Sequence, residues 1–149
     1  MKIGINGIKL IKEFEGCKLK AYKCPAGVWT IGYGDTTLNG NSVKQGDIIT
    51  QSQAETMLTE TLKGYEIGIT KALKKTLNQN QFDRLEVFAY NIGINAAKKS
   101  TLLKKVNANP NDKTIAEEFL KWNKANGGKI LNGLTNRRIA EAKLYFTSV

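Results

Sequence analysis

The chain of 149 residues contains no histidine, and this absence removes whole classes of chemistry. Ser-His-Asp and Cys-His catalysis require an imidazole base, and hydrolytic zinc sites usually take at least one histidine ligand. Any hydrolysis by this chain must therefore rely on carboxylates, hydroxyls or thiols. We expect neither a metal ion nor a cofactor.

Cysteine, proline and long apolar runs are also scarce. The two cysteines, Cys17 and Cys24, are not spaced like zinc ligands, and we expect reduced thiols rather than a disulfide. Only two prolines and a hydrophobic content of 41% are typical of a globular protein. The stretch "MKIGINGIKLIKEFEG" shows neither a signal peptide nor a membrane anchor, so the sequence predicts synthesis in the cytosol and no stable membrane insertion.

Acidic side chains are few relative to basic ones. The chain has 23 Lys and Arg against 13 Asp and Glu, a net charge of +10. This balance favours an anionic partner, which is a nucleic acid, a membrane surface or an acidic polysaccharide; a basic surface that serves only solubility is the alternative. The lysines are scattered, without a basic helix or an RRM-type aromatic motif, which argues against nucleic acid.

One turn-rich segment near the N-terminus predicts the β-structure of the chain. Asn6 as N-cap and Gly16 as C′ residue bound a first helix that precedes it. "LKAYK", the turn "CPAG" and "VWTIGYG" then predict a β-hairpin, and Asn39-Gly40 in "TTLNGNS" predicts a second hairpin turn.

The remainder of the sequence predicts helices. Thr50 and Gln53 form a capping box at the start of a long helix over 51–75. Further helices are predicted over 80–92, 101–107, 114–126 and 135–146. The fold class is therefore α+β but predominantly α-helical, in one domain over 1–149. We expect a small N-terminal α+β lobe (about 13–60), the connecting helix (about 51–75) and a helical lobe (about 76–149) on which the first helix packs, with substrate bound in the cleft between the lobes.

Glu15 is a candidate general acid because it ends the first predicted helix. Exposed carbonyls at a helix C-terminus disfavour an ionised carboxylate, so Glu15 can stay protonated and donate its proton to a leaving oxygen, as in glycoside hydrolysis. The alternative is a solvated glutamate on a fraying helix end.

Cys24 and Thr30 are the candidates for the second half of such a reaction. The Thr30 hydroxyl can hold a water, and a Cys24 thiolate can activate that water or attack carbon itself; the alternative is a small buried thiol and a β-branched strand residue. An ideal four-residue turn pairs Ala21 with Thr30, which places Cys24 and Thr30 on opposite faces unless a twist or bulge intervenes. Few ordinary thiols are ionised at pH 7, and Lys20 and Lys23 are candidates for lowering the pKa of Cys24.

The order Glu15, eight residues, Cys24, five residues, Thr30 resembles the E-x8-(D/C)-x5-T signature of phage-type lysozymes, or endolysins. "NQFDRLEVFAYNIG", "STLLKKVN" and "WNKANGGKILNGLTNRRIAEAKLYF" are similar to the C-terminal lobe of that family, so the resemblance covers nearly the whole chain. It implies a two-lobed, lysozyme-like fold. It also implies hydrolysis of the β-1,4 bond between N-acetylmuramic acid and N-acetylglucosamine in peptidoglycan.

The resemblance further implies roles for single residues. Glu15 matches the family's acid, Cys24 stands where many members have aspartate, and Thr30 matches the threonine that positions water. Arg137 resembles the arginine that pairs with the catalytic glutamate, and neighbouring Arg138 fits the same motif. The implied substrate-binding residues are Gly34, Tyr90, Asn91, Thr101 and Arg137. Asp35 stands where relatives usually have histidine, which predicts a changed ion pair.

By the same resemblance, the partner is the glycan strand of bacterial peptidoglycan, bound by a monomer. The family implies an enzyme that waits in the host cytoplasm and reaches the cell wall in the periplasm through a separate holin-type pore. Whether the anomeric configuration is inverted or retained is left open by the sequence. A catalytically dead relative that binds glycan, or that disrupts membranes through "IAEAKLYF", is the alternative.

Overall fold

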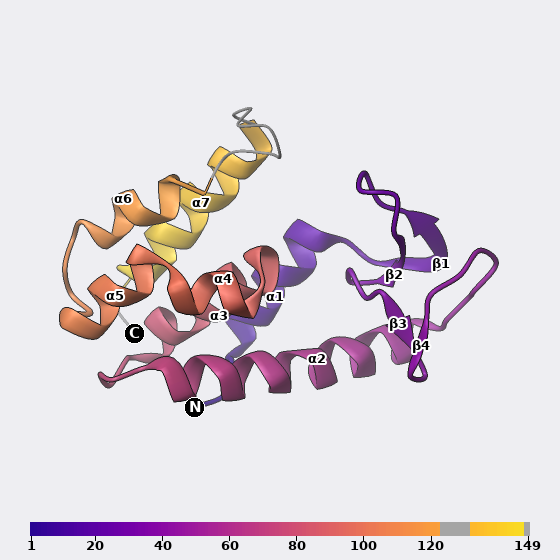
Figure 1. The fold of residues 1–149 in the computed structure, drawn as a ribbon, viewed down its shortest axis with the longest axis horizontal. Helices are drawn as coiled ribbons and strands as arrows, with labels where there is room; N and C mark the ends of the chain where they lie inside the picture. The colour runs from indigo at the N-terminus through magenta and orange to yellow at the C-terminus, as the bar shows by residue number, and fades with distance from the viewer. Residues whose placement is uncertain (123–131, 148–149) are drawn as a thin grey trace. The chain divides into compact units, whose positions relative to one another are not determined.

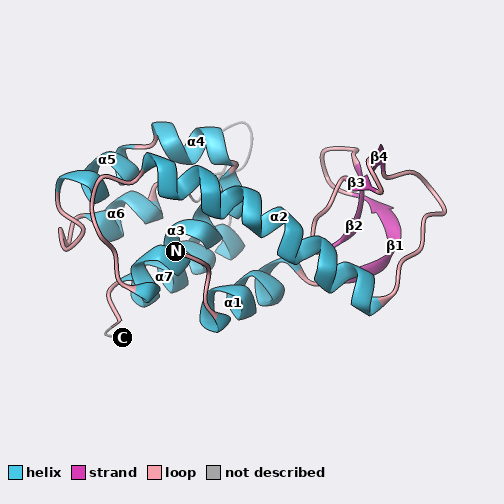
Figure 2. Ribbon diagram, turned by 90° about the horizontal axis from the view of Figure 1, so that it is seen from below, coloured by secondary structure: helices cyan, strands magenta, loops and turns pink. Residues whose placement is uncertain are grey.

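The structure is a computed structural model that describes residues 1–122 and 132–147. It is mostly helical, with two short antiparallel hairpins that precede the long helix α2 (Figure 1, Figure 2). The contacts divide the chain into two compact units, which we call the mixed unit (Lys9–Gly64) and the helical unit (Met1–Ile8 together with the chain from Tyr65 onward). The helices are α1 (Ile5–Glu15), α2 (Gln51–Ala72), α3 (Gln79–Ile92), α4 (Ile94–Lys99), α5 (Thr101–Ala108), α6 (Ile115–Leu120) and α7 (Asn132–Tyr145), and the strands are β1 (Lys18–Lys23), β2 (Trp29–Gly32), β3 (Thr37–Leu38) and β4 (Asn41–Ser42).

The first helix, α1, begins earlier than predicted and ends where predicted. Asn6, the predicted N-cap, is the second residue of the helix. The backbone N–H of Gly4 donates to Asp83 Oδ1 of α3 at 2.8 Å, so a carboxylate from a distant part of the chain supplies the negative charge that a helix N-terminus favours. At the other end Gly16 has φ of +65° and its N–H donates to the Lys12 carbonyl at 3.0 Å, as expected of a C′ glycine.

The hairpin of β1 and β2 differs from the prediction in its register. The turn begins at Cys24 as predicted, and the Gly27 N–H donates to the Cys24 carbonyl at 2.8 Å. However, the Cys24 N–H also donates to the Val28 carbonyl at 2.9 Å, so the loop comprises the three residues 25–27 with Gly27 at φ +79°. Tyr22, not Ala21, is therefore opposite Thr30.

This register decides which side chains share a face of the hairpin. Residues two apart on a strand point to the same side, and so do directly paired residues. Since Tyr22 pairs with Thr30, the side chains of Tyr22, Cys24 and Thr30 lie on one face. The opposite faces that an ideal four-residue turn would give are avoided, because the loop is one residue longer than a two-residue hairpin connection.

The second hairpin and the start of α2 agree with the sequence. Asn39 and Gly40 both have positive φ, 51° and 80°, as a type I′ turn between β3 and β4 requires. The capping box forms as predicted, since the Thr50 N–H donates to Gln53 Oε1 at 2.8 Å and the Gln53 N–H donates to Thr50 Oγ1 at 3.1 Å.

The long helix α2 ends at Ala72, three residues before the predicted limit. The side chain of Asn107 in α5 accounts for this end. Its Nδ2 donates to the Ala72 carbonyl at 3.0 Å and its Oδ1 accepts from the Lys74 N–H at 2.7 Å. A side chain from another helix thus satisfies backbone groups that would otherwise continue α2.

The helical unit is built around α3, in which every residue from 80 to 89 is buried. Its core includes an aromatic group in which the Phe88 and Phe119 rings meet edge to face at 5.5 Å and the Phe119 and Tyr145 rings lie 5.8 Å apart. Helix α4 was not predicted; it is only six residues long and follows Gly93, which has φ of +97°.

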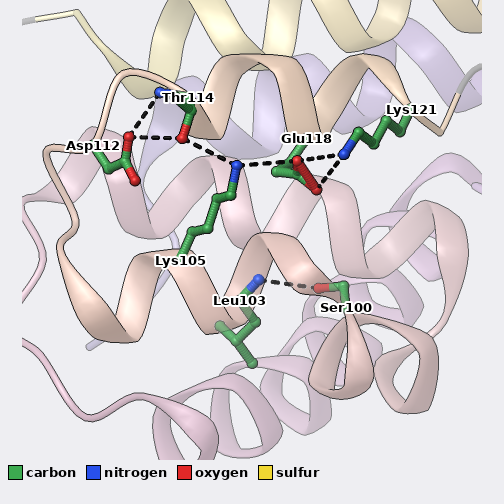
Figure 3. Close-up of polar contacts among 7 residues, drawn as sticks. All are labelled: Ser100, Leu103, Lys105, Asp112, Thr114, Glu118 and Lys121. Carbon is green, nitrogen blue, oxygen red and sulfur yellow. Dashed lines mark hydrogen bonds and ion pairs between the residues drawn. The ribbon is translucent and has the colours of Figure 1, made fainter.

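The shorter helices follow local capping signals. Ser100 Oγ accepts from the Leu103 N–H at 3.1 Å and so caps α5 (Figure 3). Helix α6 ends at Leu120, short of the predicted limit at 126, and residues 123–126 of that prediction lie outside the described residues. Helix α7 begins at Asn132 rather than at 135. None of the helices in the described part of the chain is long and apolar enough to cross a membrane.

Glu86 of α3 is a fully buried carboxyl group without a hydrogen-bond partner among the described residues. Burial, together with the nearby charges of Glu66 and Asp83, raises the pKa of Glu86 to about 8. Because this pKa is higher in the folded protein than in the unfolded chain, the protonated form is the one that the fold accommodates. Its contribution is fully present below about pH 4.5 and is lost as the pH rises through about 8.

We therefore expect the free energy of unfolding of the wild-type protein to fall across this pH range. Glu86→Gln, a neutral isostere, should remove that part of the slope. At pH 9 the variant should be more stable than the wild type by on the order of 2–4 kcal/mol, and near pH 4.5 the two should be similar. Urea unfolding at several pH values measures this, with the exposed Glu117→Gln as the control. Parallel stability curves for wild type and Glu86→Gln would contradict the assignment.

Candidate active site

Glu15 lies at the C-terminal end of α1 and is half-buried. Tyr22 of β1 is affected by both Glu15 and Cys24. Burial raises the pKa of the Tyr22 hydroxyl most, and the negative charges of Glu15 and Cys24 raise it further. Both groups thus act electrostatically on the same hydroxyl of β1. Glu15 and Cys24 therefore both lie within electrostatic range of Tyr22.

Cys24 and Thr30 flank the turn between β1 and β2. Thr30 is buried, and its hydroxyl donates to the Val28 carbonyl at 3.0 Å, which leaves the lone pairs of the oxygen to accept from a water. Hydrogen bonds from the backbone of Val28 first, and then from the backbone of Ala26 and the Thr30 hydroxyl, lower the pKa of the Cys24 thiol. The expected direction of this shift is present, but its cause is the turn itself.

The two lysines that the sequence suggested are not the main cause of the lowered pKa of the Cys24 thiol. Neither Lys20 nor Lys23 is among the largest causes of the shift in the pKa of Cys24. Lys23 instead places its ammonium group over the Trp29 ring, 5.5 Å from the ring centroid. Both cysteines are free thiols.

A polar network attaches the region around Glu15 to the first turns of α2. Lys12 Nζ lies 2.6 Å from Glu55 Oε2, and the Tyr33 hydroxyl donates to Glu55 Oε1 at 3.0 Å. Gln51 Nε2 donates to both Tyr33 and Glu55 at 3.0 Å, and the Cys17 thiol donates to Gln51 Oε1 at 3.6 Å. Residues on either side of Glu15 in the sequence are therefore held by the same helix. Sequence reasoning missed this network, because its members are far apart along the chain.

Gly34 and Asp35 follow β2 in a tight turn. Ile31 and Asp35 exchange two backbone hydrogen bonds at 2.9 Å, and the exposed Gly34 between them has φ of +100°, which favours glycine. Asp35 is buried and accepts from the Thr61 hydroxyl at 3.1 Å, and burial raises the pKa of this carboxyl. The changed ion pair expected at Asp35 is not formed with any described residue; a neutral hydroxyl takes the place of a charged partner.

The remaining predicted site residues, Tyr90, Asn91, Thr101 and Arg137, belong to the helical unit. The half-buried Tyr90 ring lies against the Tyr65 ring, with centroids 5.5 Å apart. Asn91 is exposed and its Oδ1 accepts from Arg138 Nη2. Thr101 is the exposed first residue of α5.

Arg137 and Arg138 share one buried carboxylate, Glu141. Arg137 Nε donates to Glu141 at 3.2 Å, and Arg138 Nη1 donates to both of its oxygens at 2.8 and 2.6 Å. Arg138 is fully buried, donates from Nε to the Trp122 carbonyl at 2.9 Å and lies over the Phe88 ring. The buried Arg138 thus holds the side chain of Asn91 by a hydrogen bond. Glu141 was missed by sequence reasoning, although its spacing of three and four residues from the two arginines is the expected signal for helical ion pairs.

No cluster of three or more His, Cys, Asp or Glu side chains that could hold a metal ion occurs among the described residues.

Comparison with known proteins decides the family. Residues 12–141 match the model of the phage lysozyme family. The chain belongs to the phage lysozyme family. The endolysin of Bacillus phage B103 is 45% identical over 149 residues, which are 99% of this chain and 55% of that protein. The endolysin of Acyrthosiphon pisum secondary endosymbiont phage 1 is 44% identical over 148 residues, which are 97% of this chain and 98% of that protein.

The solved structure of an endolysin from Escherichia coli phage FAHEc1 is similar to this phage lysozyme over its whole length. The identity is 43%, the TM-score is 0.92, and the match covers 100% of this chain and 96% of that one. The resemblance read from the sequence and the predicted fold class are confirmed. The chain spans about half the length of the Bacillus phage relatives that it matches.

The turn geometry makes a prediction for the Cys24 thiol. In a Cys17→Ser background, the rate of Cys24 alkylation as a function of pH should give an apparent pKa below that of an ordinary thiol. Thr30→Val removes a hydroxyl that can turn its proton from the Val28 carbonyl to the thiolate when Cys24 ionises, and it should raise this pKa. Lys20→Gln and Lys23→Gln serve as controls and should leave it near the wild-type value. A higher pKa in the lysine variants with no change in Thr30→Val would contradict the assigned cause.

Proposed function

We propose that this phage lysozyme is an endolysin, which hydrolyses the β-1,4 bond between N-acetylmuramic acid and N-acetylglucosamine in bacterial peptidoglycan and thereby lyses the host cell. The main support is the hairpin register that puts Cys24 and Thr30 on one face, with Glu15 and Cys24 acting on the same tyrosine hydroxyl. Family membership and relatives that are named endolysins add to this support.

Glu15 is proposed as the general acid. Its carboxyl proton passes to the glycosidic oxygen as the bond from that oxygen to the anomeric carbon breaks, so that the sugar leaves as a neutral alcohol. The network of Lys12 and Glu55 supports this role, because it fixes α1 one turn before Glu15. The residue that delivers the proton is held by neighbours that take no part in the transfer.

Cys24 and Thr30 are proposed to complete the reaction. A water that donates to Thr30 Oγ1 attacks the anomeric carbon and loses its proton to the Cys24 thiolate, or the thiolate attacks carbon first and water then releases the sugar. The Thr30 hydroxyl supports the first route because it acts as a donor within the turn, which leaves its oxygen free to accept from the water. The lowered pKa of Cys24 supports both routes, since each needs the ionised thiol.

The glycan-binding residues are proposed to be Gly34, Tyr90, Asn91, Thr101 and Arg137. Asn91 is the best supported of these, because its amide is exposed while Arg138 fixes its orientation. Gly34 supplies exposed backbone without a side chain, which permits close approach of a sugar. The half-buried Tyr90 ring has the mixed apolar and polar character that suits a sugar face.

The proposed setting follows the family. The protein acts as a monomer, remains in the host cytoplasm until lysis begins, and reaches the peptidoglycan of the cell wall through a holin-type pore. A non-catalytic relative that only binds the envelope is the competing function, and the next experiment separates the two.

Glu15→Gln should lower the rate of peptidoglycan hydrolysis by at least about 10²-fold, since the amide keeps the size of the side chain but does not donate a proton in the same way. Release of reducing sugar from purified peptidoglycan measures the rate, and circular dichroism verifies the fold. Glu13→Gln removes the same charge from an exposed position two residues earlier on α1 and serves as the matched control. Equal rates for Glu15→Gln and the wild type would overturn the assignment, and no hydrolysis by the wild type would favour the binding function.

Two substitutions of Cys24 test its chemical role. Cys24→Asp introduces the residue common in the family and should retain substantial activity. The limb of the pH profile on which activity increases with pH should move to lower pH, because a carboxyl ionises at lower pH than a thiol. Cys24→Ser keeps the size of the side chain but hardly ionises near neutrality, and should be severely impaired. The pH dependence of kcat is the measurement. Full activity in Cys24→Ser would leave Glu15 and a water held by Thr30 to carry the reaction.

A further inference from the structure

The positive charge of the chain is concentrated in one of its two units. The mixed unit has seven lysines and six acidic residues, whereas the helical unit has 16 basic and seven acidic residues. Among the described residues of this unit, three arginines (Arg84, Arg137 and Arg138) are buried, and so are four of its seven acidic residues. The four acidic residues are Asp83, Glu86, Glu118 and Glu141.

Six exposed lysines of the helical unit come from the last turn of α2, from the loop that follows α2, from α4 and from α5. We call them the lysine surface: Lys71, Lys74, Lys75, Lys98, Lys99 and Lys104. None of them forms an ion pair with a described residue. Unpaired ammonium groups of this density are a footprint for a polyanion.

The three helices of the lysine surface contact one another. A Cβ placed on Gly68 of α2 would lie 2.9 Å from the Ile94 side chain and 3.7 Å from Lys98 Cε, so Lys98 of α4 lies across α2. Lys71 follows Gly68 by one helical turn and is exposed. The lysines of α2 and α4 therefore belong to one region.

Helix α5 meets the same end of α2. Asn107 bonds to the Ala72 carbonyl and the Lys74 N–H, and Lys104 precedes Asn107 by one turn. Both views show α4 and α5 beside the C-terminal half of α2 (Figure 1, Figure 2). Lys104 is thus continuous with the lysines of α2 and α4.

Lys105, the residue that follows Lys104 in α5, is neutralised within the protein. Lys105 and Lys121 converge on the buried Glu118, at 3.2 and 2.7 Å (Figure 3). Lys105 also donates to the Thr114 hydroxyl at 3.0 Å. Adjacent positions of one helix therefore differ in kind: Lys105 is engaged within the protein, whereas Lys104 is exposed and has no ion pair among the described residues.

We propose that the lysine surface binds the phosphate-bearing anionic polymers of the bacterial cell wall and so retains the enzyme on its substrate. Lysines on flexible stems suit phosphates of irregular spacing, because each acts as a point charge without a fixed geometry. Binding releases counterions, so the affinity falls as the salt concentration rises. The proposal rests on the proposed function, since it is the action on peptidoglycan that brings the chain to the wall.

The test uses a triple variant with one charge reversed on each helix, Lys71→Glu, Lys98→Glu and Lys104→Glu. The matched control reverses three exposed lysines of the mixed unit, Lys9, Lys44 and Lys63, and gives the same net charge. Both sets are made with Glu15→Gln to prevent digestion. Co-sedimentation measures binding to intact cell walls and to walls from which the phosphate polymers have been removed chemically. A Lys→Gln version of the triple variant, with thermal unfolding of all variants, guards against loss of fold.

We expect the wild-type surface to bind intact walls more tightly than stripped walls, with an affinity that falls as salt is added. The triple variant should lose about 10-fold or more on intact walls and little on stripped walls, the Gln version should lose less, and the control should lose little. An equal loss of affinity in the control, or an equal loss on stripped walls, would overturn the proposal. So would a triple variant that loses affinity for duplex DNA in the same assay but keeps its affinity for intact walls.

Hydrolysis of soluble peptidoglycan fragments separates this proposal from the proposed function. With Glu15 restored, the triple variant should turn over these fragments at the wild-type rate, because they carry no phosphate polymer. If the wild type fails to hydrolyse them, the proposed function fails, whatever the binding results. If hydrolysis is intact but wall binding is unchanged in the triple variant, the lysine surface alone is refuted.

Discussion

The three-residue loop between β1 and β2 is the constraint on which the site in the mixed unit depends. Gly27 closes this loop in a left-handed conformation, and the loop length sets Tyr22 opposite Thr30. A register shift of one residue would turn every side chain of the shifted strand to the other face of the hairpin. Thr30 and Cys24 would then lie on opposite faces, and the Thr30 hydroxyl could no longer reach the thiolate. The chemistry proposed for this unit is thus fixed first by backbone geometry and only then by side chains.

The helical unit faces a different constraint, which is that its helices carry charged residues at buried positions. Asp83 is satisfied by donors at the N-terminus of α1, and Glu141 by two arginines of its own helix. Arg84 is fully buried, its guanidinium has no hydrogen-bond partner among the described residues, and burial lowers its pKa to about 10. The unit therefore keeps most of its acidic groups inside, and its lysines dominate the surface.

The sequence predicts what is decided locally and misses what is decided by distant contacts. The Asn39-Gly40 turn, the capping box of Thr50 and the stop at Gly16 all have their partners within a few residues, and all form as predicted. The end of α2 depends on Asn107, a residue 35 positions from Ala72, and the sequence around Ala72 has no signal for it. The same holds for the site: Glu15, Cys24 and Thr30 were found from spacing in one segment, whereas Glu55 and Tyr33 were not.

The contacts of the first residues bear on the order in which the chain folds during synthesis. Residues 1–8 belong with the chain from Tyr65 onward: the Ile3 N–H donates to Glu66 at 3.3 Å and the Gly4 N–H donates to Asp83. The mixed unit is a continuous segment, so all of its internal contacts are available once Gly64 has been made. The ribosome releases N-terminal segments first, and yet the first turn of α1 must wait for α3. The segment that carries Glu15, Cys24 and Thr30 is therefore complete early, while the residues made first are among those that find their partners late.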